Sequence, residues 1–271
     1  DYDGGRLFYG SYQLGSFYRI DSNNNFTDIA QTGTDNLIEV TQSGGITANL
    51  SISRIVATQN GTNNRSSVLQ NGTATDFFTL SVSTNQVGDD NESDATQFGT
   101  NNVATIDQIG DLNVSTVTQQ AGGLNNNTDV NQTGDEGLSE VTQGGTSNLA
   151  TINQGGLDNN SFVVQSGESQ LATVNQSGEE NTADIEQASL NHTAFIDQIG
   201  DFNGSFIVQT AAGSEDNSAS STQGGDENLS EITQSGSDNT ATVSQSGDVN
   251  DSFLTQTGSG NTATVSQLND F

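Results

Sequence analysis

The chain contains no cysteine, proline, methionine or tryptophan, and only four of its 271 residues are basic. Without cysteine no disulfide can form, so the fold depends on packing and hydrogen bonds. The absence of proline is typical of strands in which every backbone N–H takes part in a ladder. Leu, Ile, Val and Phe make up only about a fifth of the residues, and no run of them is long enough to span a membrane.

The acidic residues number 34 and give a net charge of −30. Such a chain is expected to repel nucleic acid. Low apolar content with high charge lies near the boundary for disorder, which is one interpretation of the unassembled chain. Most Asp and Glu fall at expected turns or outward strand positions. There we expect a solvated coat that opposes clumping, with weak divalent-cation binding as the alternative.

Glutamine recurs every eleven residues through most of the chain, which is the signature of a stacked repeat architecture. The unit reads Gln-x-Gly-x-x-Asn-x-(Ala/Ser)-x-(Val/Ile)-x-Gln. Ala and Ser alternate for much of the chain, so the full repeat is 22 residues in two similar halves. The regular glutamines are Gln97, Gln108, Gln132, Gln143, Gln154, Gln165, Gln176, Gln187, Gln198, Gln209, Gln223, Gln234, Gln245, Gln256 and Gln267. The matching asparagines are Asn102, Asn113, Asn148, Asn159, Asn181, Asn203, Asn217, Asn228, Asn239, Asn250 and Asn261.

Each half-repeat alternates with a period of two and therefore predicts a strand. The glycine between strands predicts a reversal of the chain with a positive φ angle. The turn glycines are Gly99, Gly110, Gly134, Gly145, Gly156, Gly167, Gly178, Gly200, Gly225, Gly236, Gly247 and Gly258. Two strands and two turns close one rung, and rungs stacked at about 4.8 Å place each side chain over its counterpart. The sequence predicts an all-β fold, a two-sheet parallel β-solenoid of 22-residue strand-turn-strand rungs with amyloid-like, cross-β stacking.

The predicted interior combines small, β-branched and amide side chains. Ala or Ser opposite Val or Ile lets two sheets close tightly, as in a steric zipper. Stacked Gln and Asn amides can hydrogen-bond along the axis, which removes the cost of burying them. We therefore predict that the regular Gln and Asn residues form structural ladders used in self-assembly.

The repeats are unevenly distributed along the chain. Residues 1–24 hold no complete repeat, residues 25–96 form irregular repeats with insertions, and residues 97–271 form regular repeats in one continuous solenoid. Two small insertions are expected before Gly123 and near Ala211. About 21 half-repeats give roughly ten rungs and a rod about 50 Å long.

Five positions depart from the pattern, and the rungs that carry them should be weaker. Ser189 replaces a turn glycine, His192 and Gln170 replace asparagines, and Gly137 replaces another. Ala121 stands where a glutamine is expected. We expect His192, the only histidine, to be a satisfied polar substitute rather than a catalyst or metal ligand.

The unit from Gln234 to Gln245, with Gly236, Asn239 and Ala241 in place, resembles the curlin repeat of curli, the bacterial extracellular amyloid. The resemblance covers about nine tenths of the chain. It implies a secreted structural subunit that assembles with itself into a fibre on the bacterial surface, builds biofilm matrix and mediates adhesion. Its implied partners are a nucleator subunit and the outer-membrane secretion channel, which would recognise residues 1–24. It implies no cofactor, metal, enzymatic activity or membrane insertion.

Other interpretations stay open at this point. The chain could be the minor, nucleating curlin subunit, or a secreted solenoid that does not polymerise, such as an adhesin, a calcium-dependent rod or an ice-binding rod. Ice binding requires a flat Thr array, and Asp, Glu and Phe interrupt the recurrent threonines Thr105, Thr116, Thr151, Thr173, Thr242 and Thr264. The outward residues Phe162, Phe195, Phe206 and Phe253 form either a contact stripe or scattered exposure. No nucleophile has a nearby base in a unique setting, which argues against an enzyme.

Overall fold

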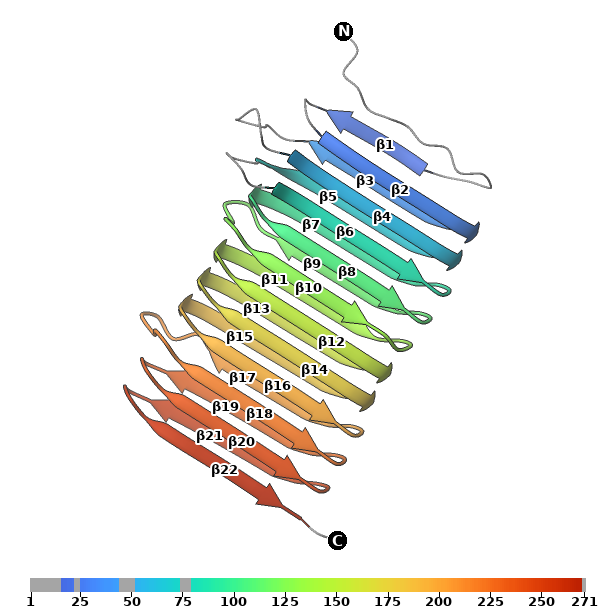
Figure 1. The fold of residues 1–271 in the computed structure, drawn as a ribbon. Coiled ribbons are helices and arrows are strands. Elements are labelled where there is room, and N and C mark those ends of the chain that lie inside the picture. Colours follow the sequence, from blue (N-terminus) through green and yellow to red (C-terminus); the bar gives the residue numbers. More distant parts are fainter. Residues whose placement is uncertain (1–15, 22–24, 44–51, 74–78, 270–271) are drawn as a thin grey trace.

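The computed structural model describes residues 16–21, 25–43, 52–73 and 79–269, and every element in these ranges is a β-strand. Two parallel sheets, each of 11 strands, lie face to face, and the chain alternates between them from one end of the rod to the other (Figure 1). The odd sheet contains β1 (Ser16–Asp21), β3 (Leu37–Ser43), β5 (Arg65–Thr73), β7 (Glu92–Thr100), β9 (Val114–Gln119), β11 (Leu138–Thr146), β13 (Asn160–Glu168), β15 (Thr182–Leu190), β17 (Gly204–Gln209), β19 (Leu229–Ser235) and β21 (Asp251–Thr257). The even sheet contains β2 (Asn25–Thr34), β4 (Ile52–Thr62), β6 (Thr79–Val87), β8 (Val103–Ile109), β10 (Asn127–Gln132), β12 (Leu149–Leu157), β14 (Leu171–Glu179), β16 (Thr193–Ile199), β18 (Ser218–Gly224), β20 (Thr240–Ser246) and β22 (Thr262–Leu268). The predicted all-β, two-sheet parallel β-solenoid is confirmed.

The strand register follows the 22-residue repeat. Ala150 pairs with Ala172, and Gln154 pairs with Gln176. Where a loop is longer the register still matches glutamine to glutamine, as for Gln198 and Gln223. Side-chain identity, rather than a fixed sequence distance, therefore sets the register.

The core lies between the sheets and is built from the inward residues of each strand. Ile152, Val163, Val174 and Ile185 are fully buried and belong to one continuous hydrophobic cluster. Val265, in the last strand, is only partly buried because no further rung covers it. Among the described residues, the C-terminal end of the core is therefore open.

The turns bring backbones very close together. A Cβ atom at Gly178 would lie 2.1 Å from the carbonyl oxygen of Gly200 in the next turn, so only glycine fits. Gly134 is the exception among the predicted turn glycines, because its φ angle is not positive. It is still required, since a Cβ there would lie 1.8 Å from the oxygen of Gly156.

The residue before each ladder asparagine also has a positive φ angle, which the sequence did not indicate. Leu112, Phe202 and Val249 adopt φ angles of 61°, 58° and 58°. This left-handed conformation costs a residue with a side chain about 1–2 kcal/mol. The hydrogen bonds of the following asparagine offset that cost.

The two predicted insertions lie in the loops of residues 120–126 and 210–217, which project from one edge of the rod (Figure 1). No atom lies within 4 Å of a Cβ placed at Gly122 or Gly213, so both glycines face open space. The earlier insertions fall largely on residues 44–51 and 74–78, outside the described residues. At the N-terminal end β1 pairs with β3 and aligns Ile20 with Gln42, so the odd sheet extends into the segment that the sequence analysis left without a repeat.

Candidate self-assembly interface: the amide ladders

Each glutamine of the regular column, from Gln31 to Gln245, donates a hydrogen bond to the next glutamine of its sheet. In the odd sheet Gln165 Nε2 lies 3.0 Å from Gln187 Oε1, and Gln187 Nε2 lies 3.0 Å from Gln209 Oε1. Gln187 Nε2 also donates to the backbone oxygen of Leu171 in the facing sheet, at 3.0 Å. The ladder thus joins successive rungs and also ties the two sheets together.

The even sheet carries an equivalent ladder with the same direction. Every donor lies on the N-terminal side of its acceptor, so both glutamine ladders are polar along the rod. In the even sheet, hydrogen bonds of 2.9 Å join Gln132 to Gln154, Gln154 to Gln176, Gln176 to Gln198, Gln198 to Gln223, Gln223 to Gln245 and Gln245 to Gln267.

The asparagine ladders run in the opposite direction. The backbone N and the Nδ2 of Asn181 donate to Asn159 Oδ1 at 3.1 and 3.0 Å, and Asn181 Nδ2 also donates to the oxygen of Gly200 at 2.7 Å. Each such asparagine therefore joins its own turn to the turn before it and to the turn after it. The side chain satisfies backbone groups that the tight reversal would otherwise leave unpaired.

The structure brings the predicted glutamines and asparagines together in these columns, with the last members, Asn261 and Gln267, at the open end. Gln119 belongs to the odd ladder as well, accepting from Gln97 at 2.8 Å and donating to Gln143 at 3.0 Å. The expectation that Ala121 occupies a glutamine position is therefore wrong, because the insertion follows Gln119 and Ala121 lies in the loop. The eleven-residue spacing from Gln108 to Gln119 in the sequence indicates that Gln119 is the ladder residue.

The ladders also extend into the irregular repeats. Gln59 Nε2 donates to Gln86 Oε1 at 2.7 Å, and Asn64 Oδ1 accepts the backbone N–H of Asn91 at 3.0 Å. Ladder members absent from the predicted set are Gln31, Asn36, Gln42, Gln59, Asn64, Gln70, Gln86, Asn91, Gln119 and Asn126.

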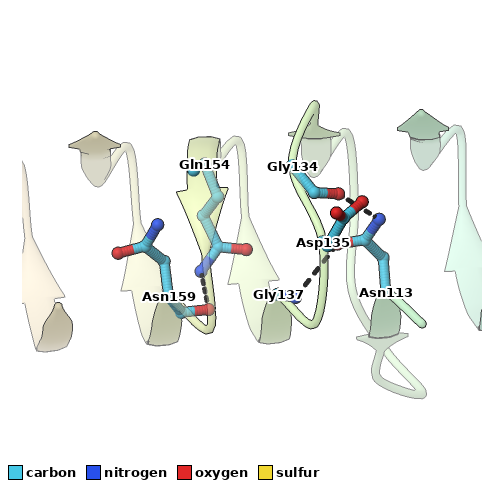
Figure 2. A pocket seen from close by; sticks show the side chains of 7 residues that line it. Asn113, Gly134, Asp135, Gly137, Gln154 and Asn159 are labelled. Atoms are coloured by element: carbon cyan, nitrogen blue, oxygen red, sulfur yellow. Dashed lines mark hydrogen bonds between the residues drawn. The ribbon is translucent and has the colours of Figure 1, made fainter. Parts of the chain in front are cut away.

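Gly137 interrupts one asparagine ladder. Its backbone N donates to Asn113 Oδ1 at 3.0 Å, but glycine has no side-chain oxygen to accept from Asn159 in the next rung. A small hollow lies there, and Asn113, Gln154 and Asn159 line it (Figure 2). Asn159 keeps its bond to the oxygen of Gly178 at 2.9 Å, so the break is confined to one rung.

His192 replaces an asparagine and is fully buried. Its Nδ1 accepts the backbone N–H of Asn217 at 3.2 Å, and its Nε2 lies 3.0 Å from Ser214 Oγ. An accepting Nδ1 means that the proton is on Nε2. Burial lowers the pKa of His192 below its ordinary value, against the opposing effects of a backbone hydrogen bond at Ala188 and the charge of Asp216. The histidine is a satisfied substitute, as predicted.

Gln170 and Ser189 fit less well into the pattern. The backbone N of Gln170 donates to Asn148 Oδ1 at 3.0 Å, but its own Oε1 is buried without a partner. Ser189 adopts a φ angle of 91°, which favours glycine. Both lie in the part of the rod that also carries His192.

The outward aromatic residues do not form one stripe. Phe162, Phe206 and Phe253 alternate with Asp184 and Glu231 in a single column of the odd sheet. Burial raises the pKa of Asp184, and the charge of Glu186 raises it further.

Phe195 faces outward on the even sheet, as do five of the six recurrent threonines; Thr116 lies on the odd sheet. In the even-sheet column Asp129 and Phe195 interrupt the threonines.

Among the described residues there is no group of three or more His, Cys, Asp or Glu that could hold a metal ion, and none of their elements is a helix able to cross a membrane.

The fold and the ladders define a class of protein, the parallel β-solenoid with buried amide ladders and open strand edges at its ends. Models of the curlin associated repeat match residues 80–110, 88–120, 162–188, 214–247 and 236–268. The chain therefore contains curlin associated repeats, and these matches support the resemblance to the curlin-repeat family. A search among curated proteins gave no match.

Proposed function

We propose that this protein is a structural subunit of an extracellular curli-type amyloid fibre, which polymerises head to tail and contributes to biofilm matrix and adhesion. Secretion through an outer-membrane channel that recognises residues 1–24, and nucleation by a minor subunit, complete the proposal. The family supports it, and the length and regularity of the repeats favour the main polymer over the nucleator. The polarity of the ladders is the observation that carries it.

That polarity specifies how two copies can meet. At the C-terminal end Gln267 Nε2 donates to the oxygen of Asp251 at 2.8 Å but has no further glutamine to meet, while Asn261 Oδ1 faces the same way. A following copy docked by its N-terminal end would continue the even glutamine ladder in its own direction, from Gln267 to Gln31, whereas the odd ladder would meet Ile20 of β1. Two C-terminal ends would instead set donor against donor and acceptor against acceptor.

The open strand edges provide the remaining bonds. β21 and β22 each pair on one side only, with β19 and β20. An unpaired edge is a template for a further strand. Docked head to tail, β22 would pair with β2 of the next copy, and β21 would pair with β1, so that both sheets become continuous.

Seeded thioflavin-T kinetics on denaturant-released monomer, with electron microscopy of the product, test the proposal. We expect a lag phase, uniform detergent-resistant fibres, and seeding of fresh monomer. Gln267→Glu should slow seeded elongation about tenfold, since it places an unpaired charge in the new interface. The matched control is Leu268→Glu, which adds the same charge at a residue that is 67% exposed. A stable β-rich monomer that never seeds would overturn the proposal.

A further inference from the structure

Charge is unequally distributed around the rod. The turns that lead from the even sheet to the odd sheet form one continuous edge, named here the acidic edge. Its carboxylates stack from turn to turn: Asp201 N donates to Asp226 Oδ1, and Asp226 N donates to Asp248 Oδ1, both at 3.0 Å. The edge comprises Asp35, Asp89, Asp90, Asp111, Asp135, Glu136, Asp158, Glu179, Glu180, Asp201, Asp226, Glu227 and Asp248.

The outward face of the odd sheet is also acidic. From β11 to β21 its outward residues include Glu140, Asp184, Glu186, Glu231 and Asp251. Within the described residues, the opposite edge of the rod carries fewer acidic residues than the acidic edge, and the loops of residues 120–126 and 210–217 project from it. A second rod with the same charges would be repelled from the acidic edge and from the outward face of the odd sheet, and the projecting loops would obstruct its approach to the opposite edge.

The outward face of the even sheet differs from the others. From β12 to β22 its three central columns hold hydroxyl, amide and a few apolar side chains, and Asp197 is the only charged residue among them. We name this surface the neutral face. It comprises Leu149, Thr151, Asn153, Leu171, Thr173, Asn175, Thr193, Phe195, Asp197, Ser218, Ser220, Thr222, Thr240, Thr242, Ser244, Thr262, Thr264 and Ser266.

We propose that the neutral face is the lateral interface between filaments, and that its occupant is the neutral face of a second copy of this chain. Two faces of this kind can approach to the usual sheet spacing of about 10 Å without opposing columns of carboxylates. Their side chains are already ordered along the rod, as Asn153 Nδ2 donates to Asn175 Oδ1 at 2.9 Å. Short polar side chains that repeat in register can interdigitate between two sheets, as they do in steric zippers.

This inference rests on the proposed polymerisation. The neutral face of one copy offers hydroxyls that water also satisfies, so an isolated pair of copies would bind weakly. A filament repeats the face at every subunit, and the contacts then act together. Lateral pairing is therefore expected of filaments and not of monomers.

A pair of double variants with equal net charge tests the interface. Thr173→Glu with Thr242→Glu places carboxylates on the neutral face, whereas Thr142→Glu with Thr233→Glu places them outward on the odd sheet. In electron micrographs of seeded filaments we expect the first variant to reduce paired and bundled filaments by about tenfold or more. The control should bundle like the wild type, and seeded elongation should be similar in both.

Cross-linking gives a second readout that does not depend on repulsion. Because the chain has no cysteine, Thr242→Cys and Thr233→Cys each introduce a single thiol. Within one filament, equivalent thiols lie a whole subunit apart, far beyond the roughly 7 Å that a disulfide spans between Cα atoms. A short bifunctional thiol reagent added to finished fibres should therefore give covalent dimers from Thr242→Cys and few from Thr233→Cys.

The outcomes separate the two proposals. No filaments from the wild type would remove the proposed function and the interface with it. Filaments that remain single, or bundles dispersed equally by both double variants, would overturn the neutral face alone. Equal cross-linking of the two cysteine variants would do the same.

Discussion

At the scale of single residues, hydrogen bonding distinguishes the buried amides from the buried hydroxyls. A ladder glutamine finds partners for both ends of its amide, as Gln165 does between Gln143 and Gln187. Several buried serines in the small-residue column of the odd sheet have no partner, Ser205 among them. Both residue types are polar and fully buried, but the amides form a continuous ladder, whereas Ser205 and most of the serines in its column have no partner.

The first prediction concerns a ladder glutamine. Gln165→Ala should lower the free energy of unfolding by about 3 kcal/mol, because it leaves a cavity and unpaired groups on both neighbours. Val164→Ala, at an outward residue of the same strand that is 40% exposed, is the control and should cost far less. Urea denaturation followed by circular dichroism measures both, and equal losses would contradict a specific role for the ladder.

The unpaired serines give a prediction of the opposite sign. Ser205→Ala should stabilise the fold by about 1 kcal/mol, because it removes a buried hydroxyl without a partner. Ser66 is the comparison, since its Oγ lies 3.0 Å from Thr84 Oγ1 and accepts from Ser93. Ser66→Ala should therefore destabilise. Loss of stability in both variants would mean that the hydroxyl of Ser205 is satisfied.

His192 predicts a pH dependence. Its folded pKa is lowered, so below the ordinary value of 6.5 the unfolded chain binds the proton more readily. The stability from neutral His192 is present above 6.5 and is lost as the pH falls through the folded pKa. Urea midpoints from pH 7.5 to pH 5 should decline more steeply for the wild type than for His192→Asn. Parallel curves would show that the imidazole can be protonated in place.

At the scale of elements, each turn combines a close glycine, a left-handed residue and an asparagine that satisfies the backbone. The broken ladder at Gly137 provides a test. Gly137→Asn should raise the free energy of unfolding by about 1 kcal/mol, since Asn113 and Asn159 then gain a partner between them. A Cβ at this position would lie 3.0 Å from Asn113 Oδ1, so that oxygen must shift slightly. Asn181→Gly, which creates the same break in an intact ladder, should destabilise.

The regular repeats were readable from sequence because each column uses one side-chain type. The 22-residue period, the two sheets and the inward Val and Ile residues all follow from it. Two features were not readable. The φ angles of Leu112 and Phe202 depend on the asparagine that follows, and the negative φ of Gly134 depends on its stacked neighbour.

At the scale of the whole molecule, like charges repeat along an axis on which copies must add. Protonated or screened carboxylates should therefore speed growth. Asp94 and Asp184 contribute most directly, because burial raises the pKa of each above the ordinary 3.8. For such a group the stabilisation is complete below the unfolded pKa and is lost as the pH rises through the folded pKa. The stability contributed by these two carboxyl groups therefore changes with pH in the opposite direction to that contributed by His192.

The final prediction separates these two effects. In a His192→Asn background, seeded elongation should be several times faster near pH 4.5 than at pH 7.5, and added salt at pH 7.5 should recover much of the difference. Asp94→Asn with Asp184→Asn should flatten the pH profile, because the two carboxylates that protonate most readily are gone. Elongation rates that do not change with pH or salt would contradict an electrostatic control of growth, and would leave strand docking itself as the limiting step.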